Sequence, residues 1–138
     1  GLTLDERLVA HGQNSFESGI DCGRQLLSCR PRPTAIFASN DDMAAGVLFV
    51  AHELGLEVPQ ELSIAGFDDI PLARQTWPAL TTIRQPISEL AQRATQMLLG
   101  RLSDAPAADA GGETIDSAIV LRGSTGPARG RSVRSCDR

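Results

Sequence analysis

The stretch that decides the fold is residues 35–69, which read AIFASNDDMAAGVLFVAHELGLEVPQELSIAGFDD. It opens with a short apolar run at 35–39, typical of a strand that is buried on both faces. The pattern then predicts a helix from 41 to about 54, ended by Gly55, and a second strand at 62–67. These elements form one βαβ unit. Because such crossovers are right-handed, the two strands are expected to be parallel, with their carboxyl ends at one edge of the sheet.

The segments around this unit predict further elements. A helix is expected over 14–29, with Asn14 as its N-cap and Glu17 completing a capping box. A short helix or turn follows Ile70, and 81–84 is expected to be extended. A third helix is expected over roughly 87–102, starting with Pro86, and a last strand over 115–122. The predicted fold class is therefore α/β, a parallel sheet with flanking helices.

Length and composition limit the possibilities. With 138 residues, 41% of them hydrophobic, the chain is long enough for one globular domain. Its longest apolar run, Met43 to Ala51, is far shorter than the roughly 20 residues of a membrane-spanning helix. The three cysteines form no C-x-x-C pair, which speaks against zinc and a disulfide framework and suggests a reducing, cytoplasmic compartment. We expect no cofactor and no metal.

The charge is unevenly distributed. The chain has a net charge of −4, and residues 1–121 carry 8 arginines against 16 acidic residues. An acidic body repels phosphate, so this part is not expected to bind nucleic acid itself. Residues 127–138 form an Arg-rich tail that we interpret as a disordered terminus rather than an anion-binding segment. The chain starts with Gly rather than Met, and we expect it to be part of a longer protein.

Polar side chains follow both strands of the βαβ unit, at the sheet edge where ligands bind in open α/β folds. Asn40 comes after the first strand and Asp68 after the second. Amide and carboxylate groups suit a ligand rich in hydroxyls. Asp41 and Asp42 are expected mainly to stabilise a helix start. From the residues alone, Asp68 is equally consistent with a ligand contact and a turn former.

The helix around Met43–Ala51 is apolar on every side, whereas a surface helix of a small layered domain should have a polar face. A subunit interface and simple burial both explain this, and we favour the interface. On that interpretation, Val47→Glu or Leu48→Glu should give folded monomers.

Several stretches together resemble the lactose-repressor/galactose-repressor (LacI/GalR) family of bacterial regulators. They are PTAIFASNDDMAAG at 33–46, VPQELSIAGFDDIPLA at 58–73, WPALTTIRQP at 77–86 and IVLRGST at 119–125. The resemblance implies that residues 1–126 are the C-terminal portion of an effector-binding domain with a periplasmic-binding-protein-like fold. The first lobe, the hinge and the helix-turn-helix are absent from this sequence.

The resemblance also implies a function. The Asn of S-N-D and the first Asp of G-F-D-D contact the effector in that family, usually a sugar or nucleoside-like molecule, and these are Asn40 and Asp68 here. It further implies a homodimer, with operator DNA bound only through the missing N-terminal domain. The aromatic residue that some members place after T-T-I-R-Q is Ile87 here, so stacking on a sugar is not expected from that side.

Two other functions fit the sequence less well. A sugar-binding protein of a transport system shares the fold but usually lacks the L-T-T-I-R-Q-P signature. An enzyme is not supported, because the sequence has no G-x-S-x-G, Cys–His pair or metal-spaced His/Asp set. On the favoured interpretation, the helix at 87–102 should pack on the absent lobe. The Asp69 side chain should point away from the site, so that Asp69→Ala would affect effector binding less than Asp68→Ala.

Overall fold

The computed structural model describes residues 5–102 and 112–128. In chain order the elements are a 3-10 helix η1 (Glu6–Leu8), α1 (Phe16–Ser28), β1 (Ala35–Phe37), α2 (Asp41–Glu53), β2 (Ser63–Ala65), α3 (Leu72–Gln75), β3 (Thr82–Arg84), α4 (Ile87–Leu102) and β4 (Ala118–Val120). The Arg-rich tail beyond residue 128 lies outside the described residues.

The predicted βαβ unit is present. Strands β1 and β2 pair in parallel, with Ile36 opposite Ile64, and α2 forms the connection between them. Both strands are shorter than the apolar runs that predicted them. Gly55, with φ 68°, follows α2 in the left-handed conformation that favours glycine after a helix.

A second pair of strands continues the sheet. Strands β3 and β4 are antiparallel, and the isolated bridges Ala65–Thr81 and Asp68–Arg84 link β3 to the β2 side in parallel. On this same side of β2, away from β1, the Ile64 N–H donates to the Ser124 carbonyl at 2.8 Å and the Gly66 N–H to the Thr81 carbonyl at 2.9 Å. The segment after β4 therefore lies against β2, on the side of the strand that does not face β1.

Helix α1 packs closely on α2 because two glycines let the backbones approach. A Cβ on Gly19 would lie 2.4 Å from the Met43 carbonyl oxygen, and one on Gly46 would lie 2.3 Å from that of Phe16. The predicted start of α1 was wrong by one residue. The N-cap is Ser15, which forms a capping box with Ser18, whereas Asn14 precedes it at φ 56°.

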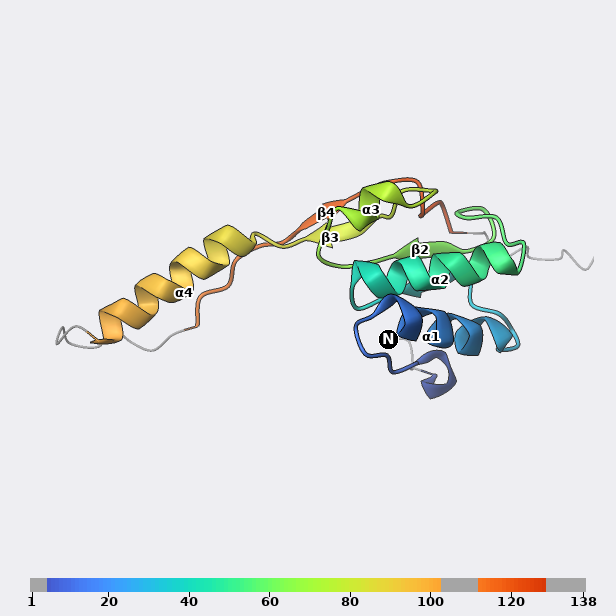
Figure 1. The fold of residues 1–138 in the computed structure, drawn as a ribbon, viewed down its shortest axis with the longest axis horizontal. Coiled ribbons are helices and arrows are strands. Elements are labelled where there is room, and N and C mark those ends of the chain that lie inside the picture. Colours follow the sequence, from blue (N-terminus) through green and yellow to red (C-terminus); the bar gives the residue numbers. More distant parts are fainter. Residues whose placement is uncertain (1–4, 103–111, 129–138) are drawn as a thin grey trace, which may run out of the picture.

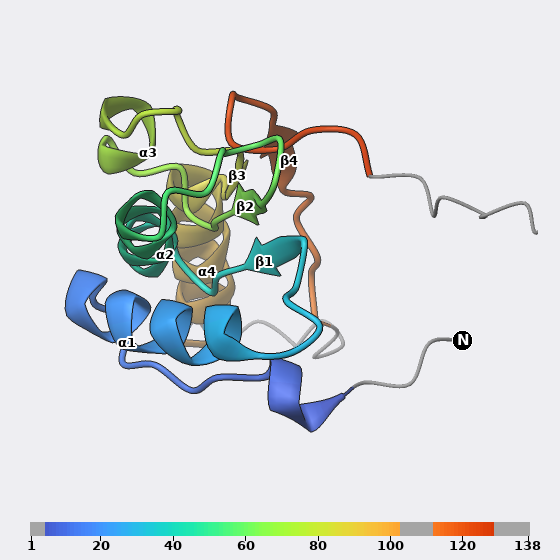
Figure 2. The same ribbon diagram turned by 90° about the vertical axis from the view of Figure 1, so that its right-hand side faces the viewer.

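Helix α2 is the centre of the core, which corrects its interpretation as a subunit interface. It lies between α1 on one side and α3 and the strands on the other (Figure 2). Val47 is 2% exposed and Leu48 is 3% exposed. The helix is apolar all round because its own domain covers it, so a glutamate at either position would disturb folding before association.

Helix α4 stands apart from the rest of the fold, at the end of an extended segment (Figure 1). None of its residues is buried. Its predicted apolar stripe is exposed, with Leu98 59% and Leu102 74% accessible. Among the described residues, no helix is long and apolar enough to cross a membrane.

Candidate functional site

Asn40 and Asp68 lie at the same edge of the sheet, as the sequence predicted. Asn40 comes three residues after β1 and Asp68 three residues after β2, and the last residues of these parallel strands, Phe37 and Ala65, are register partners. This edge, formed by the loops after β1 and β2, is called the strand-end site below.

The Asn40 side chain holds this edge together. Its Oδ1 accepts from the Met43 N–H at 2.9 Å, which caps α2, and its Nδ2 donates to the Asn14 carbonyl at 3.1 Å. Within the described part of the chain these bonds use one Oδ1 lone pair and one Nδ2 N–H, which leaves one of each for a ligand. Asn40 therefore fixes the segment before α1 and the start of α2 at this edge of the sheet.

Asn14, which the sequence pattern predicted to be the N-cap of the helix at 14–29, lies instead at the strand-end site. Besides its carbonyl bond to Asn40, its Oδ1 accepts from the Ser39 hydroxyl at 3.3 Å. The side chain is exposed, and the backbone is in the left-handed region, which asparagine tolerates better than most residues. The sequence feature that could have indicated this role is the Ser-x-x-Ser pattern at 15–18, which places the N-cap at Ser15 and leaves Asn14 outside the helix.

Asp68 occupies an unusual backbone conformation with φ 106°. Such strain, which costs on the order of 1–3 kcal/mol, clusters at functional sites. Its N–H donates to the Ile83 carbonyl at 2.8 Å, and its Oδ1 accepts from the Gln85 amide at 2.6 Å. No ion pair of Asp68 is found in the described part of the chain, so its negative charge stays available.

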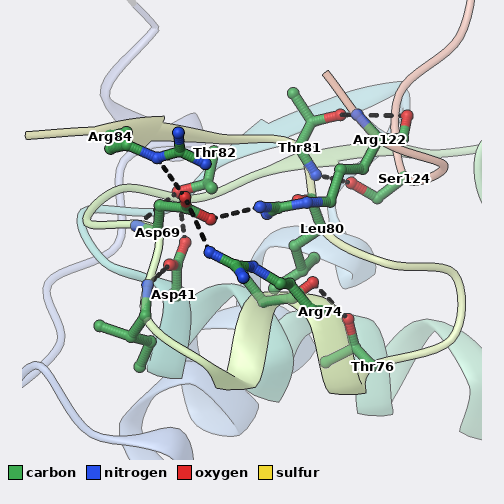
Figure 3. A network of polar contacts seen from close by, with 12 residues as sticks. Asp41, Asp69, Arg74, Thr76, Leu80, Thr81, Thr82, Arg84, Arg122 and Ser124 are labelled. Carbon is green, nitrogen blue, oxygen red and sulfur yellow. Dashed lines mark hydrogen bonds and ion pairs between the residues drawn. The ribbon is translucent and has the colours of Figure 1, made fainter. Parts of the chain in front are cut away.

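Asp69 is a buried carboxylate at the centre of an ion-pair cluster (Figure 3). Its side chain is 1% exposed and contacts Arg84 at 2.6 Å, Arg74 at 3.7 Å and, most closely, Arg122. Burial alone would raise the pKa of this carboxyl, but the hydrogen bonds and charges of Arg122 and Arg84 hold its pKa below the ordinary value. Asp69 is therefore unsuitable as a mild control for Asp68, because its side chain joins three segments of the chain.

Asp41 lies beneath the same loop and is fully buried. It accepts from the Thr82 hydroxyl at 2.6 Å and from the Ile70 N–H at 2.9 Å. Burial raises the pKa of this carboxyl, the two hydrogen bonds counteract that, and the charges of Asp68 and Asp69 add to the rise. Beyond stabilising a helix start, Asp41 fixes the loop that carries Asp68 against β3.

Two of the three carboxylates thus hold the fold, and the third, Asp68, has fewer partners among the described residues. Asp41 accepts hydrogen bonds from Thr82 and Ile70, and Asp69 forms ion pairs with arginines of the same domain. Asp68 keeps one carboxylate oxygen without a partner among the described residues. The strand-end site can therefore bind a small molecule that donates hydrogen bonds. In the described residues, no group of three or more His, Cys, Asp or Glu could hold a metal ion.

Comparison with known proteins identifies the class to which this fold and edge belong. Residues 1–125 match the periplasmic binding protein-like domain, so the chain belongs to that domain family. Its relatives within the family are LacI-type regulators, which confirms the resemblance seen in the sequence.

Two relatives are repressors. The chain is 45% identical over 102 residues to the transcriptional repressor PurR of Pectobacterium carotovorum. This match covers 74% of this chain and 30% of PurR. It is 39% identical over 125 residues to the transcriptional repressor CytR of Escherichia coli, covering 91% of this chain and 36% of CytR. The chain therefore spans about a third of the length of these relatives.

A solved structure extends the likeness to a ligand complex. A LacI-family transcriptional regulator from Arthrobacter, in complex with lactose, superposes with a TM-score of 0.72 at 32% identity. The match covers 83% of this chain and 43% of that one.

Proposed function

We propose that residues 1–126 are the C-terminal part of the effector-binding domain of a LacI-type transcriptional regulator. A small effector binds at the strand-end site, and the part of the protein outside this sequence completes the cleft. Binding then alters operator affinity by favouring one arrangement of the lobes, to the extent that the effector prefers that arrangement. The observation that carries the proposal is Asp68, at the ligand-binding edge of the sheet, with a left-handed backbone conformation and no ion pair to any residue that the structure describes.

The proposed effector is a sugar or a related hydroxyl-rich molecule. A carboxylate accepts hydrogen bonds and does not donate them, so Asp68 favours hydroxyl groups. Asn40 and Asn14 add two side-chain amides after β1, the neighbouring strand. The lactose complex of the similar Arthrobacter regulator supports this ligand class.

The remaining proposals concern partners. The intact protein is proposed to be a cytoplasmic homodimer without enzymatic activity, and operator DNA to bind only through its N-terminal domain. The repressor relatives favour this over a transport protein. Because Val47 is buried, the proposed dimer contact is formed by exposed apolar side chains such as Phe49 and Trp77, which are 44% and 87% accessible.

Calorimetry on the complete protein tests the proposed function. D-ribose, D-galactose, lactose, adenosine and cytidine are titrated into wild type and Asp68→Ala. We expect one of these compounds to bind, and Asp68→Ala to weaken its affinity by one to two orders of magnitude, from roughly 1.5–3 kcal/mol of lost charged hydrogen bonding. Failure of all five to bind, or equal affinity in both proteins, would contradict the proposal.

A further inference from the structure

A cluster of charged side chains lies at the end of the body opposite the strand-end site. Helices α1 and α2 both begin at that site, where Asn40 caps α2 and donates to the Asn14 carbonyl. Each helix has 13 residues and is therefore about 20 Å long. The two helices end on the side of the body that faces away from α4 (Figure 1). Across these ends, Arg24 Nη2 on α1 donates to Glu53 Oε2 on α2 at 3.1 Å.

Arginines gather at this end although the body is acidic. Residues 1–121 hold 8 arginines against 16 acidic residues, and half of these arginines line two pockets here. The pockets have volumes of 230 Å³ and 160 Å³, and Arg30 belongs to the walls of both. Among the residues that the structure describes, the acidic side chains in these walls are Asp5 and Glu53. They are outnumbered by four arginines: Arg7, Arg24, Arg30 and Arg32.

Backbone carbonyls hold two of these arginines in place. Arg30 Nη1 donates to the Ser28 and Cys29 carbonyls at 3.2 and 3.0 Å. Arg32 Nε donates to the Leu27 carbonyl at 3.3 Å. These bonds cap the end of α1, but they use only one nitrogen of each guanidinium group. Both side chains are exposed, and in the described part of the chain their other N–H groups have no partner.

Each pocket also exposes a leucine. Leu54, which is 51% accessible, lines the larger pocket together with Arg24, and Leu8, which is 43% accessible, lines the smaller pocket together with Arg7. A nucleic acid backbone would contact the guanidinium groups and leave the leucines in water. A peptide that carries both carboxylates and apolar side chains would contact both kinds of group. The composition of the pockets therefore favours a peptide.

We propose that this end of the body docks an acidic, leucine-containing segment of a partner protein. The docking surface, called the basic end surface below, consists of Arg7, Leu8, Arg24, Arg30, Arg32 and Leu54. Its guanidinium groups bind the carboxylates of the segment with paired hydrogen bonds, and its leucines contact the apolar side chains. Because the basic end surface lies a full helix length from the strand-end site, the partner does not compete with an effector.

Fluorescence anisotropy with a labelled synthetic peptide of four Asp-Asp-Leu repeats tests the proposal on the 138-residue chain. We expect a Kd below about 300 μM at about 50 mM salt. Raising the salt concentration to about 300 mM should increase this Kd at least about fivefold, because exposed charges are screened. Arg30→Gln combined with Arg32→Gln should weaken binding about tenfold or more.

Two further variants separate docking from folding. Arg30 and Arg32 also cap α1, so circular dichroism checks that their double variant is folded. Arg24→Gln removes a side chain that makes no backbone bond in the described residues, and it should weaken binding about threefold by itself. Leu54→Ser should weaken binding of the Asp-Asp-Leu peptide about threefold and leave binding of an Asp-Asp-Ser peptide unchanged.

Matched controls remove the same charge elsewhere. Arg93→Gln combined with Arg101→Gln does so on α4, and Arg129→Gln combined with Arg131→Gln does so in the Arg-rich tail. Both pairs should bind the Asp-Asp-Leu peptide within about twofold of wild type.

Three results would overturn the proposal. One is that the peptide does not bind. Another is that a control pair loses as much affinity as the variant of Arg30 and Arg32, or that Arg24→Gln binds as wild type. The third is that a short oligothymidine binds as tightly as the peptide and loses affinity in the same variants, which would assign the basic end surface to nucleic acid. None of these results affects the proposed function, which depends on Asp68 at the other end of the body.

Discussion

At the scale of single residues, three nearby carboxylates have different roles because their surroundings differ. Asp69 is surrounded by arginines and Asp41 is buried under a loop, whereas the Asp68 carboxylate contacts the Gln85 amide and no other side chain that the structure describes. Sequence reasoning identified Asp68 from its place after a strand. It could not assign Asp69, because the arginines that surround it come from α3, β3 and the segment after β4.

Replacing Asp69 should destabilise the domain. Asp69→Ala leaves Arg122, which is 14% exposed, without its carboxylate, and we expect a loss of about 2 kcal/mol, moderated by the exposure of Arg84 and Arg74. Chemical denaturation at pH 7 measures this, with Asp116→Ala, in an exposed position, as the control. A loss no larger than the control's would contradict the assigned cluster.

The pH dependence of that loss has a definite sign. The pKa of Asp69 in the folded domain lies below its ordinary value of 3.8, so its stabilisation is complete above that value. It is lost as the pH falls through the lowered pKa of the folded state. The difference in stability between wild type and Asp69→Ala should therefore shrink between about pH 5 and pH 2. A difference that grows on acidification would be inconsistent with this pKa direction.

Gly66 is expected to tolerate no side chain. A Cβ there would lie 2.3 Å from Asp41 Oδ1 and would displace the carboxylate that fixes the loop after β2. We expect Gly66→Ala to cost about 2–3 kcal/mol of stability through the disturbed buried hydrogen bonds. Gly100→Ala on α4, where a Cβ meets nothing within 4 Å, is the control and should be neutral or slightly stabilising. Similar melting temperatures for the two variants would argue against the close contact.

At the scale of elements, α2 explains why pattern reading succeeded for the fold and failed for the interface. The capping Asn40, the apolar run and Gly55 placed this helix to within a residue or two. An all-apolar helix is equally consistent with a partner subunit and with a covering helix of the same chain. The two explanations differ in whether α1 covers α2. Gly19 on α1 and Gly46 on α2 let the two helices come close enough for this, and the distance between helices cannot be predicted from the sequence pattern.

Two substitutions on α2 separate folding from association. Val47→Glu places a charge in the core and should unfold the domain or destabilise it by several kcal/mol. Phe49→Glu, at a position 44% exposed, should leave the fold intact and weaken the proposed dimer of the complete protein. Circular dichroism and sedimentation velocity distinguish the two results. A folded Val47→Glu protein would mean that α2 is not the centre of the core, and a fully dimeric Phe49→Glu protein would remove that side chain from the interface.

At the scale of the whole molecule, the chain consists of one packed body and a helix that it does not cover. The body contains α1, α2, α3 and the strands, whereas α4 extends from it with no buried residue (Figure 1). The spacing of apolar residues in the sequence predicted the apolar stripe of α4. The family resemblance predicted that this stripe packs on a lobe outside this sequence and is exposed in the 138-residue chain. We expect the stripe to pack on the rest of the complete protein.

Substitutions on α4 should therefore have effects that depend on the length of the chain studied. In the 138-residue chain, Met97→Gln should change the free energy of unfolding by less than about 0.5 kcal/mol, because the side chain contacts no core. In the complete protein the same substitution should cost about 1–3 kcal/mol, since it replaces a packed thioether with an amide. Gln92→Ala, on the opposite face of the helix, is the control and should be near neutral in both. Denaturation of both proteins with each variant measures the difference, and equal effects of Met97→Gln in the short and the complete chain would show that the rest of the protein does not cover α4.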